Sequence, residues 1–274
     1  MSDYFEIAIT VENEDQKNQL VALLSDIGFE GFQEDNKILL AYAAVDDFDQ
    51  VMMESILKTY NLSYLQSVIK PKNWNEEWEA GFEPVIIHDF CAIRASFHSP
   101  VAGVSHEIII TPKMSFGTGH HATTYMMIEA MSVLNFTGMK VLDFGTGTGV
   151  LAILASKMGA AVIEAVDYDE WSIENGRENI VRNNCSNISL YKSDSLFAVG
   201  KADIILANIN KNIITQHLDA MKEHLLPGGV LLLSGLLADD LEDIEKLALL
   251  KSLVLKRVFE RNSWICIHLA SQYK

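Results

Sequence analysis

The stretch Met139-Lys140-Val141-Leu142-Asp143-Phe144-Gly145-Thr146-Gly147-Thr148-Gly149-Val150 decides the fold of this 274-residue chain. Its apolar start predicts a buried strand that runs into a loop with glycines at 145, 147 and 149. An apolar helix over residues 150–158 follows the loop, and a second strand over residues 161–166 ends on Asp167. Strand, glycine-rich loop, helix, strand and acid in this order are typical of a nucleotide pocket in an α/β fold.

The glycine spacing narrows the choice of ligand. Glycines let backbone N–H groups approach a ligand, and the following helix N-terminus offers further free donors. The dinucleotide fingerprint is Gly-x-Gly-x-x-Gly, whereas this loop reads Asp-x-Gly-x-Gly-x-Gly from Asp143. That version resembles motif I of class I S-adenosylmethionine-dependent methyltransferases. Their ligand has a cationic amino-acid end, which suits an acid such as Asp143; a glycine-rich turn without a ligand is the alternative.

Composition and length place the chain among soluble globular proteins. Hydrophobic residues make up 49% and charged residues 21% of the sequence, and the length suits one large domain or two smaller ones. No apolar run approaches about 18 residues, and the N-terminus lacks a basic region. We therefore expect a cytoplasmic protein without membrane association. Cys91, Cys185 and Cys266 are few, odd in number and without metal-ligand spacing, so we expect reduced thiols.

Negative charge is concentrated at the start of the chain. The formal net charge is −16, and residues 1–60 hold thirteen acids against three lysines, which leaves −10 there. Such a field disfavours direct binding to nucleic acid and attracts a basic protein partner. A solvated acidic surface that aids solubility explains the charge equally well.

The first 69 residues predict a small domain of their own. Strands are expected over 4–11, 29–33, 38–44 and 62–69, and helices over 13–27 and 46–60. This β-α-β-β-α-β order is the ferredoxin-like split βαβ motif. The segment has no glycine-rich loop and no clustered histidines, so it is interpreted as a recognition domain or a structural cap. Residues 70–82 are the predicted linker, where Trp74 and Trp78 lie on one face of a short helix, and residues 83–274 form the second domain.

A second glycine- and threonine-rich loop precedes the core strand. Strands expected over 85–87, 91–97 and 106–111 lead to the loop of residues 112–124, and a helix over 124–134 follows. Because the loop comes just before the glycine-rich motif, we expect it to fold over the ligand. His120 and His121 are adjacent, so their side chains diverge, and no further ligand lies at suitable spacing. We expect no metal site.

The order of elements after residue 168 distinguishes a methyltransferase sheet from a dehydrogenase sheet. The sequence predicts a polar helix over 169–183 and strands over 188–191, 202–207 and 230–233. It also predicts a helix over 239–249 and a hairpin over 253–269. Ser193-Asp194-Ser195 follows the first of these strands, where adenine contacts or a plain turn are expected. A parallel sheet that ends in an antiparallel hairpin is typical of methyltransferases rather than dehydrogenases. The predicted fold is α/β: a Rossmann-like seven-stranded class I methyltransferase sheet with an N-terminal ferredoxin-like α+β domain.

Taken together, the loops resemble one family, the bacterial methyltransferases of large-subunit ribosomal protein L11 known as PrmA. The segment from Phe116 to Thr124 is similar to the family's Phe-Gly-Thr-Gly-Thr-His-Pro-Thr-Thr, with His120 and Ala122 replacing the family Thr and Pro. Asn208-Ile209 matches the family's Asn-Ile after strand four. The spacing of Trp74 and Trp78 and the acidic first domain extend the likeness over nearly the whole chain.

The resemblance implies an enzyme that uses S-adenosylmethionine to methylate Lys side chains and the N-terminal amine of L11. It implies cofactor contacts from these residues: Thr124, Gly145, Asp167 and Asn208, with Phe116, Thr123, Asp143 and Gly147 around them. Gly145 is expected to let the backbone approach the methionine part, Asp167 to accept from the ribose and Thr124 to close the pocket. Asn208 lies at a carboxyl strand end and is the candidate catalytic residue, orienting the amine.

The sequence leaves further functions open. A nucleic-acid amino-methyltransferase often carries Asn-Pro-Pro-aromatic after strand four, whereas this chain has Asn208-Ile209-Asn210-Lys211. A small-molecule N-methyltransferase, a non-catalytic cofactor-binding regulator and a dehydrogenase are also candidates. We expect a monomer.

Overall fold

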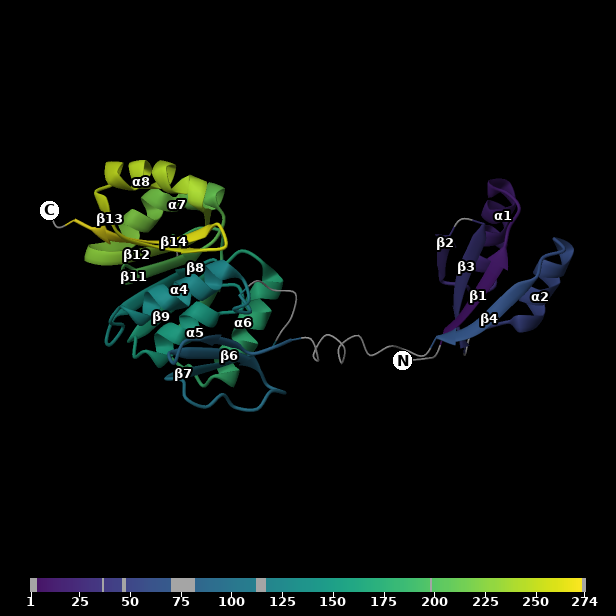
Figure 1. Ribbon diagram of the computed structural model, residues 1–274, viewed down its shortest axis with the longest axis horizontal. Coiled ribbons are helices and arrows are strands. Elements are labelled where there is room, and N and C mark those ends of the chain that lie inside the picture. The colour runs from purple at the N-terminus through teal and green to yellow at the C-terminus, as the bar shows by residue number, and fades with distance from the viewer. Residues whose placement is uncertain are drawn as a thin grey trace. The chain divides into compact units, whose positions relative to one another are not determined.

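The chain forms two compact units, Met1–Gly81 and Phe82–Lys274, in the computed structural model (Figure 1). The structure describes residues 4–35, 37–45, 48–69, 82–111, 117–197 and 199–272. The predictions on Phe116, Trp74 and Trp78, and nearly all of the predicted linker, lie outside the described residues. Each unit has a hydrophobic core of its own.

The first unit is a four-stranded antiparallel sheet with two helices. Its elements are β1 (Tyr4–Thr10), α1 (Glu14–Ser25), β2 (Gly31–Asp35), β3 (Ile38–Ala44), α2 (Gln50–Thr59) and β4 (Tyr64–Ile69), with strand order β2-β3-β1-β4. Ile7 and Ile9 alternate into the core, where Leu20 and Leu57 from the helices meet them. This is the predicted ferredoxin-like order. Helix α2 begins later than position 46, because the Asp49 carboxylate caps it by accepting from Met52 N at 3.0 Å.

The second unit is built on a seven-stranded sheet of order β10-β9-β8-β11-β12-β14-β13. The strands are β8 (Lys140–Phe144), β9 (Val162–Asp167), β10 (Ile188–Lys192), β11 (Ala202–Asn208), β12 (Leu225–Leu237), β13 (Leu253–Arg261) and β14 (Trp264–Ser271). The first five are parallel, and β14 runs antiparallel to both of its neighbours. The predicted class I methyltransferase fold is thereby confirmed.

Helices cover both faces of this sheet. They are α4 (Ala122–Ser132), α5 (Val150–Lys157), α6 (Glu170–Arg182), α7 (Lys211–His224) and α8 (Leu241–Leu250). Figure 1 shows α4 and α5 on one face and α7 and α8 on the other, and each face has its own apolar core. Helix α7 was not predicted from the sequence. Strand β12 begins at Leu225, so Pro227, Gly228 and Gly229 lie inside the strand instead of before it.

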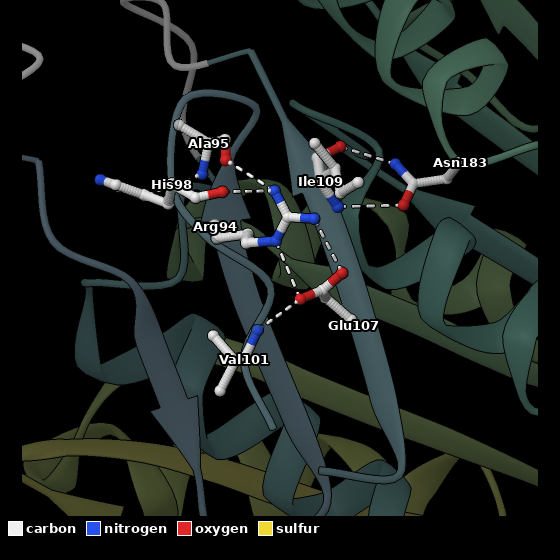
Figure 2. Close-up of polar contacts among 7 residues, drawn as sticks. All are labelled: Arg94, Ala95, His98, Val101, Glu107, Ile109 and Asn183. Carbon is white, nitrogen blue, oxygen red and sulfur yellow. Dashed lines mark hydrogen bonds and ion pairs between the residues drawn. The ribbon is translucent and has the colours of Figure 1, made fainter. Parts of the chain in front are cut away.

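A third, small sheet joins β5 (Val85–Ile87), β6 (Cys91–Ala95) and β7 (His106–Ile110). Strands β6 and β7 are parallel, and a half-buried ion pair between Arg94 and Glu107 connects them (Figure 2). Arg94 Nε lies 2.8 Å from Glu107 Oε1, and another guanidinium nitrogen of Arg94 donates to the His98 carbonyl at 2.9 Å. The guanidinium lowers the pKa of Glu107. Of the helices in the described ranges, none has the length and apolar character needed to cross a membrane.

Candidate functional site

A cavity of about 930 Å³ lies at the carboxyl ends of the parallel strands. Phe144, Asp167 and Asn208 end β8, β9 and β11, and Trp264 begins the antiparallel β14, so all four reach the same edge of the sheet. Open α/β sheets bind ligands at this edge. Among the predicted site residues, the following line the cavity: Thr123, Gly145, Gly147, Asp167 and Asn208.

Asp143 lies beneath the glycine-rich loop and is not among the cavity-lining residues. It is fully buried, and its Oδ2 accepts from Thr146 Oγ1 at 2.6 Å and from Ala152 N at 3.2 Å. Burial raises the pKa of Asp143 to about 7 against the lowering effect of these two bonds, and the nearby Asp167 carboxylate raises it further. The carboxyl therefore holds the loop from below.

Gly145 is required by the packing of the protein itself. Its φ is +77°, and a Cβ at this position would lie 2.2 Å from Ile209 Cγ2. Ile209 follows Asn208 directly, so the bare backbone of Gly145 lets the loops after β8 and β11 approach each other. Any side chain at 145 would displace the segment that carries Asn208.

Asp167 joins the glycine-rich loop to the end of β9. Its Oδ2 accepts from Gly147 N at 2.8 Å and its Oδ1 accepts from Asp169 N at 3.0 Å. Each carboxylate oxygen has further lone pairs, so Asp167 can also accept from ligand hydroxyls. Ser193, Asp194 and Ser195 line the same part of the cavity. The predicted ribose contact of Asp167 stays a prediction.

Asn208 and Thr124 form a hydrogen-bonded pair, of which only Asn208 lines the cavity. Asn208 Nδ2 donates to Thr124 Oγ1 at 3.2 Å, and Thr124 is fully buried. Because the amide nitrogen is held in this way, the carbonyl oxygen is left to accept. That oxygen is buried and has no hydrogen-bond partner in the described part of the chain. Thr124 thus orients Asn208, and its predicted closure of the pocket and cofactor contact stay predictions.

Aromatic rings line the cavity at two places, and two of their residues, His217 and Trp264, were not predicted from the sequence. His121 caps α4 by accepting from Thr123 N at 3.3 Å, and its ring packs edge-on against Trp264 with centroids 4.9 Å apart. The Phe144 ring lies 5.1 Å from the His217 ring. His217 belongs to the helix that was not predicted, and Trp264 reaches the cavity only because β14 pairs with β12, a pairing that no local motif reveals.

The two adjacent histidines point to different surroundings. His120 Nε2 lies 3.0 Å from the Glu83 carbonyl oxygen, whereas His121 faces the cavity. Within the described ranges, no three side chains of His, Cys, Asp or Glu gather as metal ligands.

Comparison with known proteins gives a consistent result. A family model described as ribosomal protein L11 methyltransferase (PrmA) matches residues 3–272. The ribosomal protein L11 methyltransferase of Porphyromonas gingivalis is 40% identical over 90% of this chain and 88% of its own length, and that of Bacteroides fragilis is 35% identical over 96% and 98%. The crystal structure of a ribosomal protein L11 methylase from Lactobacillus delbrueckii subsp. bulgaricus is similar with a TM-score of 0.65 and 27% identity, covering 70% of this chain and all of that chain.

Proposed function

This chain belongs to the ribosomal protein L11 methyltransferase (PrmA) family, and from that premise we propose that it methylates amines of ribosomal protein L11 with S-adenosylmethionine as methyl donor. The amines are Lys side chains and the N-terminal amine. Because the substrate is a ribosomal protein, the cytoplasmic location is part of the proposal. So is the monomeric state.

The cavity residues fit this cofactor. Gly145 and Gly147 present bare backbone to the cavity, and helix α5, which begins at Val150, directs its N-terminal N–H groups toward it. The Asp167 carboxylate can still accept hydrogen bonds from ligand hydroxyls. When bound, the cofactor supplies a methyl group activated by a sulfonium. The protein must then hold a neutral amine in line with the bond that breaks.

The amine has to lose its proton, and the distribution of charge in the cavity suits that need. A Lys amine of pKa about 10.4 costs roughly 4.6 kcal/mol to neutralise at pH 7, whereas an α-amine costs about 1 kcal/mol. A carboxylate beside the amine would raise this cost. The acids among the described cavity-lining residues are Asp167, Asp169 and Asp194. Asp167 ends β9, and Asp169 and Asp194 follow β9 and β10, so all three lie on the other side of β8 from Asn208.

The observation that carries the proposal is the free carbonyl oxygen of Asn208. It is an uncharged acceptor at the strand end where chemistry occurs in this fold class, and Thr124 fixes its amide. We expect the Asn208 side chain to turn when the cavity fills, so that this covered oxygen takes a hydrogen bond from a neutral amine and aims the nitrogen lone pair at the methyl group. It does so without raising the amine pKa as a full charge would.

The direct test is methyl transfer between purified components. Ribosomal protein L11, the enzyme and S-adenosylmethionine are mixed, and the intact mass of L11 is followed. We expect the mass to rise in multiples of one methyl group, and S-adenosylhomocysteine to inhibit the rise. Binding of cofactor without any change in the mass of L11 would support a non-catalytic regulator instead. Failure to bind the cofactor would reject the proposal at its first step.

A further inference from the structure

Helix α6 directs a row of asparagine side chains, the asparagine column, into the protein interior. Asn175 and Asn179 lie within the helix and Asn183 is its C-cap residue; their spacing of four residues puts all three on one side. Asn175 and Asn179 are fully buried, and Asn183 is 7% exposed. The sequence analysis identified this helix as polar; the structure shows that part of its polar face is internal. Buried amides are retained only with partners, so each of their contacts has a consequence.

The column binds the backbone edge of β7. Asn183 Oδ1 accepts from Ile109 N at 3.0 Å, and its Nδ2 donates to the Ile109 carbonyl at 2.6 Å (Figure 2). At Thr111, two residues after Ile109, the backbone N–H donates to Asn179 Oδ1 at 2.7 Å. Since β7 is an edge strand of the small sheet, these side-chain amides take the place of a neighbouring strand.

Asn179 makes a contact that Asn183 does not make. Its Nδ2 donates to the Thr148 carbonyl in the glycine-rich loop at 2.9 Å and to Asn175 Oδ1 at 2.8 Å. Thr148 Oγ1 in turn donates to the Gly117 carbonyl at 2.8 Å, and Gly117 lines the cavity. The buried amide of Asn179 therefore connects Thr111 to the glycine-rich loop. The same loop is connected to Gly117 through Thr148.

We propose that Asn179 is a positioning residue for the cofactor: it fixes the glycine-rich loop and, through Thr148, Gly117 at the cavity wall. The inference rests on the proposed function in that it takes the cavity to be the cofactor site. Both N–H donors and the carbonyl oxygen of Asn179 are engaged, so no change of its side chain is silent. Asn183 binds the same strand without touching the loop and provides the matched control.

The test compares Asn179→Asp with Asn183→Asp. As a carboxylate, each new side chain keeps an acceptor for Thr111 N or Ile109 N and loses the donated bonds, so both variants lose stability. Binding of S-adenosylmethionine is measured by calorimetry at a temperature where circular dichroism shows both variants folded. We expect Asn179→Asp to raise the cofactor Kd roughly tenfold, because the Thr148 carbonyl loses its buried donor. Asn183→Asp should change the Kd less than about twofold. Equal effects of the two variants, or none, would overturn the proposal.

A second variant covers the case in which Asn179→Asp does not fold. Thr148→Val keeps the shape of the side chain but removes the bond to Gly117, and it should also weaken cofactor binding several-fold; wild-type affinity would contradict the relay.

Hydrogen–deuterium exchange of the cofactor-free protein separates this inference from the proposed function. Residues 117–123 and 144–150 should exchange faster in Asn179→Asp than in Asn183→Asp, whether or not the wild-type protein binds the cofactor. Equal exchange in the two variants would refute the inference while leaving the proposed function untouched.

Discussion

Asn208, at the end of β11, and Asn210, two residues later, differ in which atoms of the side-chain amide are already hydrogen-bonded. Asn210 Oδ1 caps α7 by accepting from Ile213 N at 3.1 Å, so its acceptor is used inside the protein. Asn208 uses its nitrogen on Thr124 and keeps its oxygen free. Both residues line the cavity, yet only Asn208 has a buried acceptor without a partner in the described ranges. We therefore propose a chemical role for Asn208 and a folding role for Asn210.

Replacement of each asparagine by alanine tests this assignment. We expect Asn208→Ala to lower kcat about 100-fold, because the amine is no longer held in line with the methyl group. Asn210→Ala should retain turnover and lose about 1 kcal/mol of unfolding free energy with its helix cap. Steady-state kinetics and thermal unfolding measure both. An Asn208→Ala enzyme with wild-type turnover would exclude the orienting role.

The buried Asp143 carboxyl predicts a pH dependence of stability. Its pKa is about 7 in the folded protein, against about 3.9 in an unfolded chain. A raised folded pKa means that the protonated acid is favoured by folding, so its stabilising contribution is complete below about pH 4 and is lost as the pH rises through 7. Asp143→Asn cannot ionise. Relative to wild type, the variant should therefore gain roughly 2–3 kcal/mol of unfolding free energy between pH 5 and pH 8. Denaturant unfolding at the two pH values checks this; a constant difference would contradict it.

Among the elements, β12 shapes the site through one glycine. Gly235 has φ of +89°, and a Cβ there would lie 2.1 Å from the Ile209 carbonyl oxygen. The register of β12 against β14 shifts between Ser234 and Leu236, so the strand bends where Ile209 approaches it. Close backbone contact at this bend sets the position of the loop after β11.

Gly235→Ala should lower stability and turnover more than Gly138→Ala, the matched substitution. Gly138 has a similar φ of +73° but nothing within 4 Å of its Cβ position, so Gly138→Ala carries only backbone strain, about 1 kcal/mol. Gly235→Ala adds a clash with Ile209 and should lower both the unfolding free energy and kcat, because Asn208 must move. Thermal unfolding and turnover measured on both variants decide the matter. Equal losses in the two would show that the contact has no role in positioning.

Sequence reasoning located the elements whose signals are local. The predictions included the glycine-rich loop after Phe144, the ferredoxin-like order and the terminal hairpin. Helix α7 was missed although its signals are local: Asn210 caps it, and Ile214, Leu218 and Met221 recur at helical spacing on its buried face. Trp264 and the Asn208–Thr124 pair depend on which strands become neighbours. Local patterns do not determine such pairings.

At the scale of the whole molecule, charge and chemistry reside in different units. Residues 1–60 carry −10 of the formal −16, whereas the cavity belongs to residues 82–274. A basic ribosomal protein would be attracted by the acidic unit through a field that salt screens over about 8–10 Å. We propose that the first unit recognises this substrate; a purely structural cap is the alternative.

Deletion of residues 1–68 separates recognition from cofactor binding. The second unit has its own sheet and its own two apolar cores, so the truncated enzyme should keep its Kd for S-adenosylmethionine nearly unchanged. Methylation of L11 should fall to background, because the acidic surface that concentrates the basic substrate is gone. In the full-length enzyme, raising the ionic strength should increase KM for L11 on the order of tenfold and leave KM for the cofactor constant. A truncated enzyme that methylates L11 at full rate would assign recognition to the catalytic unit instead.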